Sequence, residues 1–153
     1  MADIALRHAQ REDLPAVLAL YAQPSFNGGR IVTLADAERL LQRFATYPDY
    51  GLYVAEEHGA IVGTIALMVI DNIAHWGTPS ALIESVVVDE RHQGRGVGRA
   101  MMAEAMALAA RKGCYKASLS TSSADPAVHA FYESLGFSRH GISYRLDFKE
   151  NAA

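Results

Sequence analysis

The spacing of hydrophobic residues changes along the chain and divides it into helical and extended stretches. In the first third, apolar residues such as Leu14, Val17 and Tyr21 recur every three or four positions, as on one face of an amphipathic helix. From Tyr50 onward, several segments are β-branched or alternate between apolar and polar residues, which is typical of strands. The pattern predicts helices over 12–22, 34–44, 98–112 and 126–135, and strands over 4–8, 50–56, 60–70, 81–88, 114–121, 137–139 and 142–148.

Capping and turn residues support several of these boundaries. Thr33 is typical of a helix N-cap, and Asp125, followed by a proline, predicts another. The pair His58-Gly59 predicts the turn of a β-hairpin. The segment 81–88 is almost wholly apolar, which predicts a buried central strand.

The order of these elements predicts the fold class. It is β-α-α-β-β-β-α-β-α-β(-β), which describes an α/β protein with a mixed sheet, helices packed on it and at least one crossover connection. The chain has 153 residues, without an internal repeat or a linker-like change of composition. We therefore expect a single domain over residues 1–153.

The composition is that of an ordinary globular chain and narrows the function classes. The chain is 50% hydrophobic and 20% charged, with a net charge of -3, whereas a general nucleic-acid binder would carry a basic surplus. No apolar stretch approaches the ~20 residues that span a bilayer, and the N-terminus lacks the pattern of a signal peptide. We expect a cytoplasmic protein with neither a nucleic-acid nor a membrane partner.

Residue types that often carry chemistry are unevenly distributed. The histidines are scattered across different elements, so no metal site is expected. The single cysteine, Cys114, begins a predicted buried strand and is expected to be a core residue. Between Arg91 and Lys112, by contrast, basic residues outnumber the single acidic residue, Glu104. This local basic patch on a slightly acidic chain favours a small anionic ligand.

A glycine-rich turn between the predicted strand 81–88 and the predicted helix 98–112 is the most informative segment. It contains Gly94, Gly96 and Gly98, and glycine lets a backbone approach a ligand closely. The N–H groups at the start of the helix, together with its dipole, form an anion site. A Walker A loop is excluded because no Lys-Ser/Thr pair follows, and the glycine spacing departs from the dinucleotide fingerprint. The alternative is a flexible connector that binds nothing.

The same turn resembles the signature of a known family. The sequence QGRGVG of Gln93–Gly98 is similar to the Q/R-x-x-G-x-G/A motif of the GNAT superfamily of acyl-CoA-dependent N-acyltransferases, and the similarity extends through 83–88, 113–116 and 130–137. Within the superfamily, these stretches are similar to glucosamine-phosphate N-acetyltransferases and to small bacterial acetyltransferases. The resemblance implies a mixed, mostly antiparallel central sheet flanked by helices. It also implies acetyl-CoA as cosubstrate and transfer of its acetyl group to a primary amine by direct attack.

The resemblance further implies how acetyl-CoA is held. Backbone N–H groups of the turn would bind the pyrophosphate, and the end of the strand 81–88 would pair with the pantetheine arm almost as an added strand. The implied cosubstrate-binding residues are Val86, Val87, Val88, Gln93, Gly94, Arg95, Gly96, Val97, Gly98 and Arg99.

Glu84 is the candidate general base. It is the single charged residue of an apolar strand, and strict alternation places it on the face of Leu82, Val86 and Val88. Partial burial there would raise its pKa toward that of a useful base, acting directly or through water. The alternative is a carboxylate that is held in a structural hydrogen bond or faces solvent at the strand end.

Tyr132 lies where the family often places the acid that protonates the departing CoA thiolate. A phenol with an ordinary pKa near 10 retains a proton that it can give to a thiolate of pKa about 8.5. The alternative is that Tyr132 and Phe131 are aromatic residues that pack on the sheet. Seven residues before Tyr132 the family often has Asn, whereas this chain has Asp125, so a capping role competes there with a cosubstrate contact.

The acceptor amine is expected to meet the loops 23–32 and 71–80. Arg30 could pair with an acceptor phosphate or carboxylate, and His75 and Trp76 offer a contact surface. An amino-sugar phosphate is the first candidate, beside amino acids, polyamines and aminoglycosides. Two other functions stay open: a non-catalytic acyl-CoA-binding regulatory module, and an acetyltransferase acting on protein N-termini or lysines. A homodimer is compatible with the family.

Overall fold

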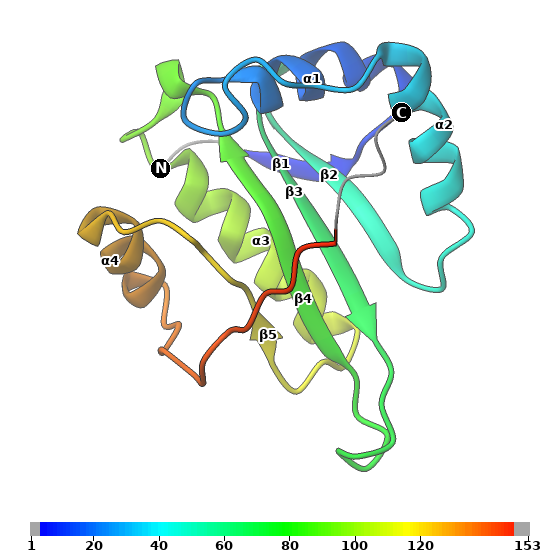
Figure 1. Ribbon diagram of the computed structural model, residues 1–153, viewed down its shortest axis with the longest axis vertical. Coiled ribbons are helices and arrows are strands. Elements are labelled where there is room, and N and C mark those ends of the chain that lie inside the picture. Colours follow the sequence, from blue (N-terminus) through cyan, green and yellow to red (C-terminus); the bar gives the residue numbers. More distant parts are fainter. Residues whose placement is uncertain (1–3, 149–153) are drawn as a thin grey trace. The chain divides into compact units, whose positions relative to one another are not determined.

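The computed structural model describes residues 4–148, which form two compact units, one ending at Leu119 and the other beginning at Ser120. The first unit contains a five-stranded sheet (Figure 1). Neighbouring strands are antiparallel, except that the last two are parallel. The predicted α/β class with a mixed, mostly antiparallel sheet is confirmed. The strands, in their order across the sheet, are β1 (Ala5–His8), β2 (Tyr50–Glu57), β3 (Ala60–Ile70), β4 (Ser80–Val88) and β5 (Ala117–Ser118).

Three α-helices belong to the described part of the first unit. They are α1 (Leu14–Ala22), α2 (Leu34–Phe44) and α3 (Val97–Arg111). The first turn of the helix predicted over 12–22 is instead a 3₁₀ turn at Arg11–Asp13. The predicted cap of α2 is confirmed, because the side chain of Thr33 accepts a hydrogen bond from the Asp36 N–H at 3.1 Å.

Different helices cover the two faces of the sheet. Val54 lies in a buried cluster with Val17 of α1, and Phe44 of α2 packs against that cluster. The next residue, Ala55, points to the opposite face, where α3 packs. A Cβ added to Gly63 on this face would lie 3.5 Å from the Cβ of Ala55 and 3.1 Å from Sδ of Met101 in α3. Since successive side chains of a strand alternate between faces, β2 and β3 are apolar on both sides.

The predicted hairpin of β2 and β3 is confirmed. His58 and Gly59 have φ angles of 51° and 83°, and two left-handed residues in succession form the kind of two-residue turn that matches the twist of antiparallel strands. Glycine meets this requirement without a steric penalty, whereas His58 adopts a conformation that few side chains favour.

The strand predicted over 114–121 is much shorter than expected. Its ladder with β4 has two residue pairs, at Ala117 and Ser118, and the Lys116 carbonyl accepts from the Ala81 N–H at 2.9 Å. A strand needs a partner for its N–H and C=O groups as well as a suitable sequence. Within the described part of the chain, β4 has no strand partner on this edge beyond Leu82. The open edge is therefore a property of the fold that the apolar pattern did not indicate.

β4 consequently differs from the buried central strand that its sequence predicts. Ala81, Ile83 and Val87 are buried, but the other residues are half-buried and Glu84 is exposed. An apolar run typically marks a strand covered on both faces and paired on both edges. Here the run instead leaves a partly exposed apolar surface beside an open backbone edge.

The second unit contains α4 (Pro126–Ser134). Its predicted cap is confirmed, because Asp125 Oδ1 accepts a hydrogen bond from the Ala127 N–H at 2.8 Å. The strands predicted over 137–139 and 142–148 are wrong, since the structure assigns no strand to these residues. The apolar alternation is present in the sequence, but the backbone joins no ladder of the described sheet.

Candidate active site

A β-bulge interrupts the ladder between β3 and β4. Between the Ala66–Glu84 pair and the Thr64–Val87 pair, β4 contains one residue more than β3. Within this bulge Ser85 has a φ of 52°, in the left-handed region that residues other than glycine seldom adopt. Strained backbone of this kind occurs preferentially at functional sites, because the surrounding structure must hold it in place.

The bulge changes which side chains accompany Glu84. Residues paired across antiparallel strands point to the same face, so Glu84 and Val87 lie together on the face that α1 and α2 cover. Strict alternation predicts Val86 and Val88 as the companions of Glu84. That prediction is wrong beyond Ser85, because the additional residue reverses the alternation.

Glu84 itself is exposed, not partly buried as its strand predicted. Burial, and then the nearby Glu84 carboxylate, raise the pKa of Tyr50 on β2. Tyr50 meets the rings of Phe44 and Tyr47 edge to face, with centroids 4.7 and 5.8 Å away. The carboxylate therefore stands beside an aromatic cluster from α2 and β2, which the sequence pattern did not indicate.

The turn after β4 has the backbone freedom that its glycines predicted. Gly94 and Gly96 have φ angles of 73° and 87°. A Cβ added to either residue would meet no atom within 4 Å. The left-handed backbone, and not crowding within the chain, is therefore what requires glycine here.

The N-terminus of α3 lacks a side-chain cap. Its N-cap residue is Gly96, which offers no capping oxygen, and the first helical hydrogen bond runs from the Ala100 N–H to the Gly96 carbonyl at 3.0 Å. N–H groups ahead of that bond have no acceptor within the helix. An uncapped helix N-terminus after a left-handed glycine fits an anionic group such as a phosphate. The side chain of Val97, in contrast, is buried in the core.

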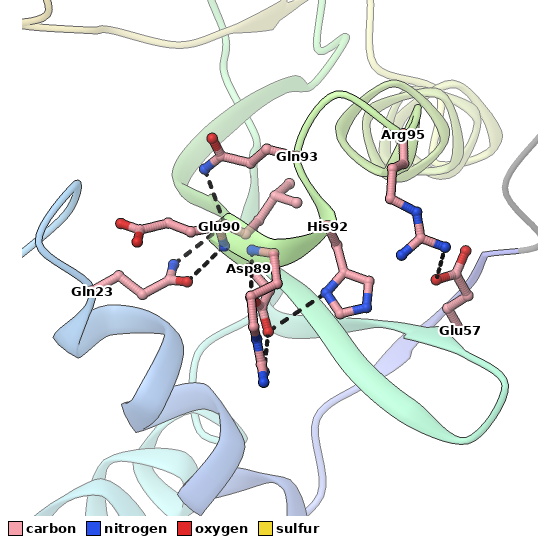
Figure 2. A network of polar contacts seen from close by, with 9 residues as sticks. Gln23, Glu57, Asp89, Glu90, His92, Gln93 and Arg95 are labelled. Carbon is pink, nitrogen blue, oxygen red and sulfur yellow. Dashed lines mark hydrogen bonds and ion pairs between the residues drawn. The ribbon is translucent and has the colours of Figure 1, made fainter.

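Arg95 is already engaged in an ion pair. Its Nη2 lies 3.5 Å from Oε2 of Glu57, a buried carboxylate at the end of β2 (Figure 2). Arg99 and Gln93 are exposed around the same turn. The basic side chains that the sequence predicted therefore lie around the turn. Arg95 is held by Glu57, a partner that the spacing of residues in the sequence could not identify.

A polar network fixes the segment between β4 and this turn. The guanidinium of Arg91 lies 2.7 Å from Asp89 Oδ2 and holds the pKa of that carboxyl at about 2. His92 Nδ1 lies 3.6 Å from the same oxygen. The Val88 carbonyl accepts two side-chain hydrogen bonds, from the amides of Gln23 at 3.2 Å and Gln93 at 3.4 Å (Figure 2).

The structure does not bring the predicted acceptor residues together. Arg30 is exposed in the loop that begins at Gln23, beside the C-terminal end of β4, and it forms no ion pair with any residue between 4 and 148. His75 and Trp76 lie before the N-terminal end of β4. The His75 ring packs against Tyr115 at 4.6 Å, and Trp76 is 95% exposed.

Tyr132 belongs to the second unit and is covered by aromatic rings. Its ring centroid lies 5.1 Å from that of Phe131 and 6.1 Å from that of Phe137. Burial raises the pKa of the Tyr132 phenol, which therefore keeps its proton throughout the physiological range. Asp125, in the same unit, acts as a helix cap.

Two absences concern the described residues alone. Between residues 4 and 148, no three His, Cys, Asp or Glu side chains gather as a metal site. None of the helices in that range is long and apolar enough to cross a bilayer.

The chain matches the model of the acetyltransferase (GNAT) family over residues 6–137. It therefore belongs to this family and is an acetyltransferase, and enzymes of the family use acetyl-CoA as cosubstrate. The glycine turn and the uncapped start of α3 fit the phosphates of that molecule.

Individual proteins of known sequence or structure are similar to this chain over nearly its whole length. Glucosamine 6-phosphate N-acetyltransferase of Trypanosoma brucei brucei is 31% identical over 149 residues, which cover 95% of this chain and 96% of that protein. A putative acetyltransferase from Agrobacterium tumefaciens str. C58 has a TM-score of 0.86 and 36% identity, covering 94% of this chain and 99% of that one. Glucosamine-6-phosphate N-acetyltransferase from Arabidopsis thaliana has a TM-score of 0.82 and 27% identity, and the match covers 95% of this chain and 99% of that one.

Proposed function

We propose that this enzyme transfers the acetyl group of acetyl-CoA to the primary amine of a small molecule, with glucosamine 6-phosphate as the first candidate acceptor. The observation that carries the proposal is the exposed Glu84 carboxylate beside the Ser85 bulge, on a strand that leads directly into the glycine turn before the uncapped start of α3. In this proposal the arrangement would offer a proton acceptor on the strand and a phosphate site in the turn that follows it. Acetyl-CoA would supply the activated acetyl group.

Each residue has a definite task in this reaction. Backbone N–H groups at Gly96 and at the start of α3 would hold the pyrophosphate. The open edge of β4 would align the pantetheine arm as an added strand. Glu84 would accept a proton from the ammonium form of the acceptor, directly or through water, so that the free amine can attack the carbonyl carbon.

Tyr132 would then supply the proton that the leaving thiolate needs. When the amine forms its bond to carbon, the carbon–sulfur bond breaks and its electron pair stays on sulfur. The Tyr132 phenol gives that sulfur a proton, the acylated nitrogen loses its second proton to solvent to become the neutral amide, and the phenolate is reprotonated from solvent. Burial, which raises the pKa of Tyr132, keeps the group in the protonated form that an acid requires.

The acceptor is proposed from two lines of support. Two relatives that match this chain over nearly their whole length have names with the same acceptor, glucosamine 6-phosphate. Arg30 is exposed and could pair with a phosphate, and Tyr50, Phe44 and Tyr47 offer aromatic faces beside Glu84. Aromatic rings next to a carboxylate suit a protonated amine attached to an apolar ring face. The cytoplasmic location and the homodimer expected above stay predictions.

A binding measurement followed by an acceptor panel tests this function. The melting temperature of the purified chain is measured with acetyl-CoA and, as the control, with ATP. A ligand at 100 times its Kd stabilises the folded state by about 2.7 kcal/mol, which corresponds to a shift of roughly 5–10 °C for a chain of this size. Release of free thiol is then followed with glucosamine 6-phosphate, glucosamine, spermidine, lysine and a peptide with a free N-terminus.

The expected result is a shift with acetyl-CoA and a higher kcat/KM for glucosamine 6-phosphate than for the other amines. No shift at millimolar acetyl-CoA would overturn the proposal. Binding without turnover of any amine would favour the regulatory module, and a preference for the peptide would favour a protein acetyltransferase.

A further inference from the structure

Gln23 occupies an unusual position between two regions of the first unit. It follows the last residue of α1 and begins the loop 23–32. Its side-chain Nε2 donates to the Val88 carbonyl at 3.2 Å, and its Oε1 accepts from the Glu90 N–H at 2.8 Å (Figure 2). One side-chain amide thus donates and accepts along the end of β4, as a backbone peptide group of a neighbouring strand would.

The Val88 carbonyl that Gln23 contacts belongs to the open edge of β4. The Asp89 N–H donates to the Val62 carbonyl at 2.8 Å and so points toward β3. Neighbouring residues of an antiparallel strand direct their N–H and C=O groups to opposite sides. Val88 therefore directs its carbonyl away from β3, toward the edge that lacks a strand partner among the described residues.

The two amides on this carbonyl are not equivalent. Gln23 donates at the shorter distance, and its oxygen is anchored a second time by the Glu90 N–H. Gln93 donates at 3.4 Å from an exposed side chain, for which the described residues provide no second anchor. A competing amide N–H would therefore displace Gln93 more easily and leave Gln23 in place.

Other contacts bind the same loop to the same strand. The Ser25 N–H donates to Glu90 Oε1 at 3.3 Å. Tyr21, in the last turn of α1, lies near the side chains of Thr64 and of Ser85 in the bulge. Burial raises the pKa of the Tyr21 phenol, and these two side chains partly offset that rise. The ring of Tyr21 stacks on Phe26 with centroids 5.3 Å apart. The end of α1 and the loop therefore touch β4 at both the bulge and its last residue.

We propose that Gln23 is a positioning residue that couples the open edge of β4 to the loop 23–32. It holds the Val88 carbonyl in the orientation that an amide N–H of the pantetheine arm would meet after displacing Gln93. Because the same side chain begins the loop, binding of the arm also tightens residues 24–30. This inference rests on the proposed function, since it requires a cosubstrate with an amide-bearing arm.

Hydrogen–deuterium exchange with and without acetyl-CoA tests the coupling, with calorimetry of acetyl-CoA on the same samples. Gln23→Met keeps the side-chain length but removes both hydrogen bonds. Gln23→Glu keeps an acceptor for the Glu90 N–H and removes the donor to Val88. Gln42→Met, on the exposed face of α2, is the matched control.

The expected result is that acetyl-CoA slows exchange in 24–30 and 89–93 of the wild type and of Gln42→Met. In Gln23→Met and Gln23→Glu the slowing in 24–30 disappears and the Kd for acetyl-CoA rises about five-fold, as the loss of one ordinary hydrogen bond predicts. A merely structural role would lower the melting temperature without removing the ligand-induced protection.

Two failures are distinguishable. A wild type that does not bind acetyl-CoA overturns the proposed function, and the inference with it. A wild type that binds and is protected, together with Gln23 variants that show the same Kd and the same protection, overturns the inference alone. Should Gln23→Met not fold, Gln23→Glu decides the question, because the two share the loss of the donor to Val88.

Discussion

The two ends of β4 differ in how they are stabilised. At its C-terminal end, the residues from Val88 to Gly96 are held by backbone geometry, side-chain amides and ion pairs, including Asp89 with Arg91 and Glu57 with Arg95. At its N-terminal end, the connection between β3 and β4 (residues 71–79, the hairpin tip) exposes Ile73 and Trp76 almost completely, at 97% and 95%. One end is fixed by a polar network, and the other exposes two large apolar side chains to solvent.

This difference separates two kinds of recognition. A phosphate can be bound by backbone N–H groups, which depend on φ angles and helix position and only weakly on side-chain identity. An acceptor must be distinguished by side chains, and those of the hairpin tip have few contacts that fix them. We therefore expect substitutions at the C-terminal end to change acetyl-CoA binding, and substitutions at the hairpin tip to change acceptor kinetics.

The largest expected effect lies between the two ends, at Glu84. Glu84→Gln removes the proton acceptor and should lower kcat about 100-fold while leaving the Kd for acetyl-CoA unchanged. Steady-state kinetics with calorimetry measure both quantities. Glu104→Gln, an exposed carboxylate on α3, is the control. A kcat within a factor of two of wild type would exclude Glu84 as the base.

The next largest effect is expected in the turn that follows the C-terminal end of β4. Gly96→Val forces a β-branched side chain into a φ of 87° and places it where phosphates would approach, so the Kd for acetyl-CoA should rise about 30-fold. Gly59→Val has a comparable φ of 83° in the β2–β3 turn and controls for backbone strain. Equal affinities in the two variants would contradict the assignment of the phosphate site.

Tyr132→Phe tests the second unit. Removal of the proton donor should lower kcat about ten-fold without changing the Kd for acetyl-CoA. Because burial raises the pKa of Tyr132, wild-type kcat should not fall as the pH approaches 10, the ordinary value of a tyrosine. Tyr144→Phe, at an exposed residue, provides the comparison. An unchanged kcat in Tyr132→Phe would remove the acid role.

A smaller effect concerns stability and pH at Asp89. The pKa of this carboxyl is about 2 in the folded chain, below its ordinary value of 3.8, so the folded state gains from its ionised form. Asp89→Asn should lower the free energy of unfolding by about 1–2 kcal/mol at pH 7, with allowance for the solvent exposure of Arg91. The gain is present above pH 4 and is lost as the pH falls toward 2. Urea unfolding of both proteins at several pH values measures this gain. A difference in the free energy of unfolding that stayed constant with pH would contradict the prediction.

The smallest effect is expected at the hairpin tip. Trp76→Ala should change the free energy of unfolding by less than about 0.5 kcal/mol, because the side chain is almost fully exposed. It should leave the Kd for acetyl-CoA unchanged and raise the KM for the acceptor about three-fold. A changed acetyl-CoA affinity with an unchanged acceptor KM would reverse the comparison between the two ends of β4.

Local features of the molecule followed from the sequence with few errors. Helical spacing located α1 and α2, Thr33 and Asp125 were recognised as caps, and His58-Gly59 was recognised as a turn. These features depend on residues within about four positions of each other, where backbone preferences and side-chain caps act directly. The glycine turn was recognisable for the same reason, because its chemistry lies in consecutive residues.

Features that need a distant partner did not follow from the sequence. The bulge at Ser85, the open edge of β4, the Gln23–Val88 hydrogen bond and the Glu57–Arg95 ion pair each join residues that the fold alone brings together. The strand predicted over 142–148 is wrong for the related reason that alternation describes a side-chain pattern, whereas a strand also requires a paired backbone. The sequence by itself thus determined the helices, the strands of the antiparallel ladders, the family resemblance and the position of the glycine turn. Only the tertiary structure decided which side chains share a face with Glu84 and which contacts hold the loop 23–32, because hydrogen bonds between distant segments depend on register and not on local composition.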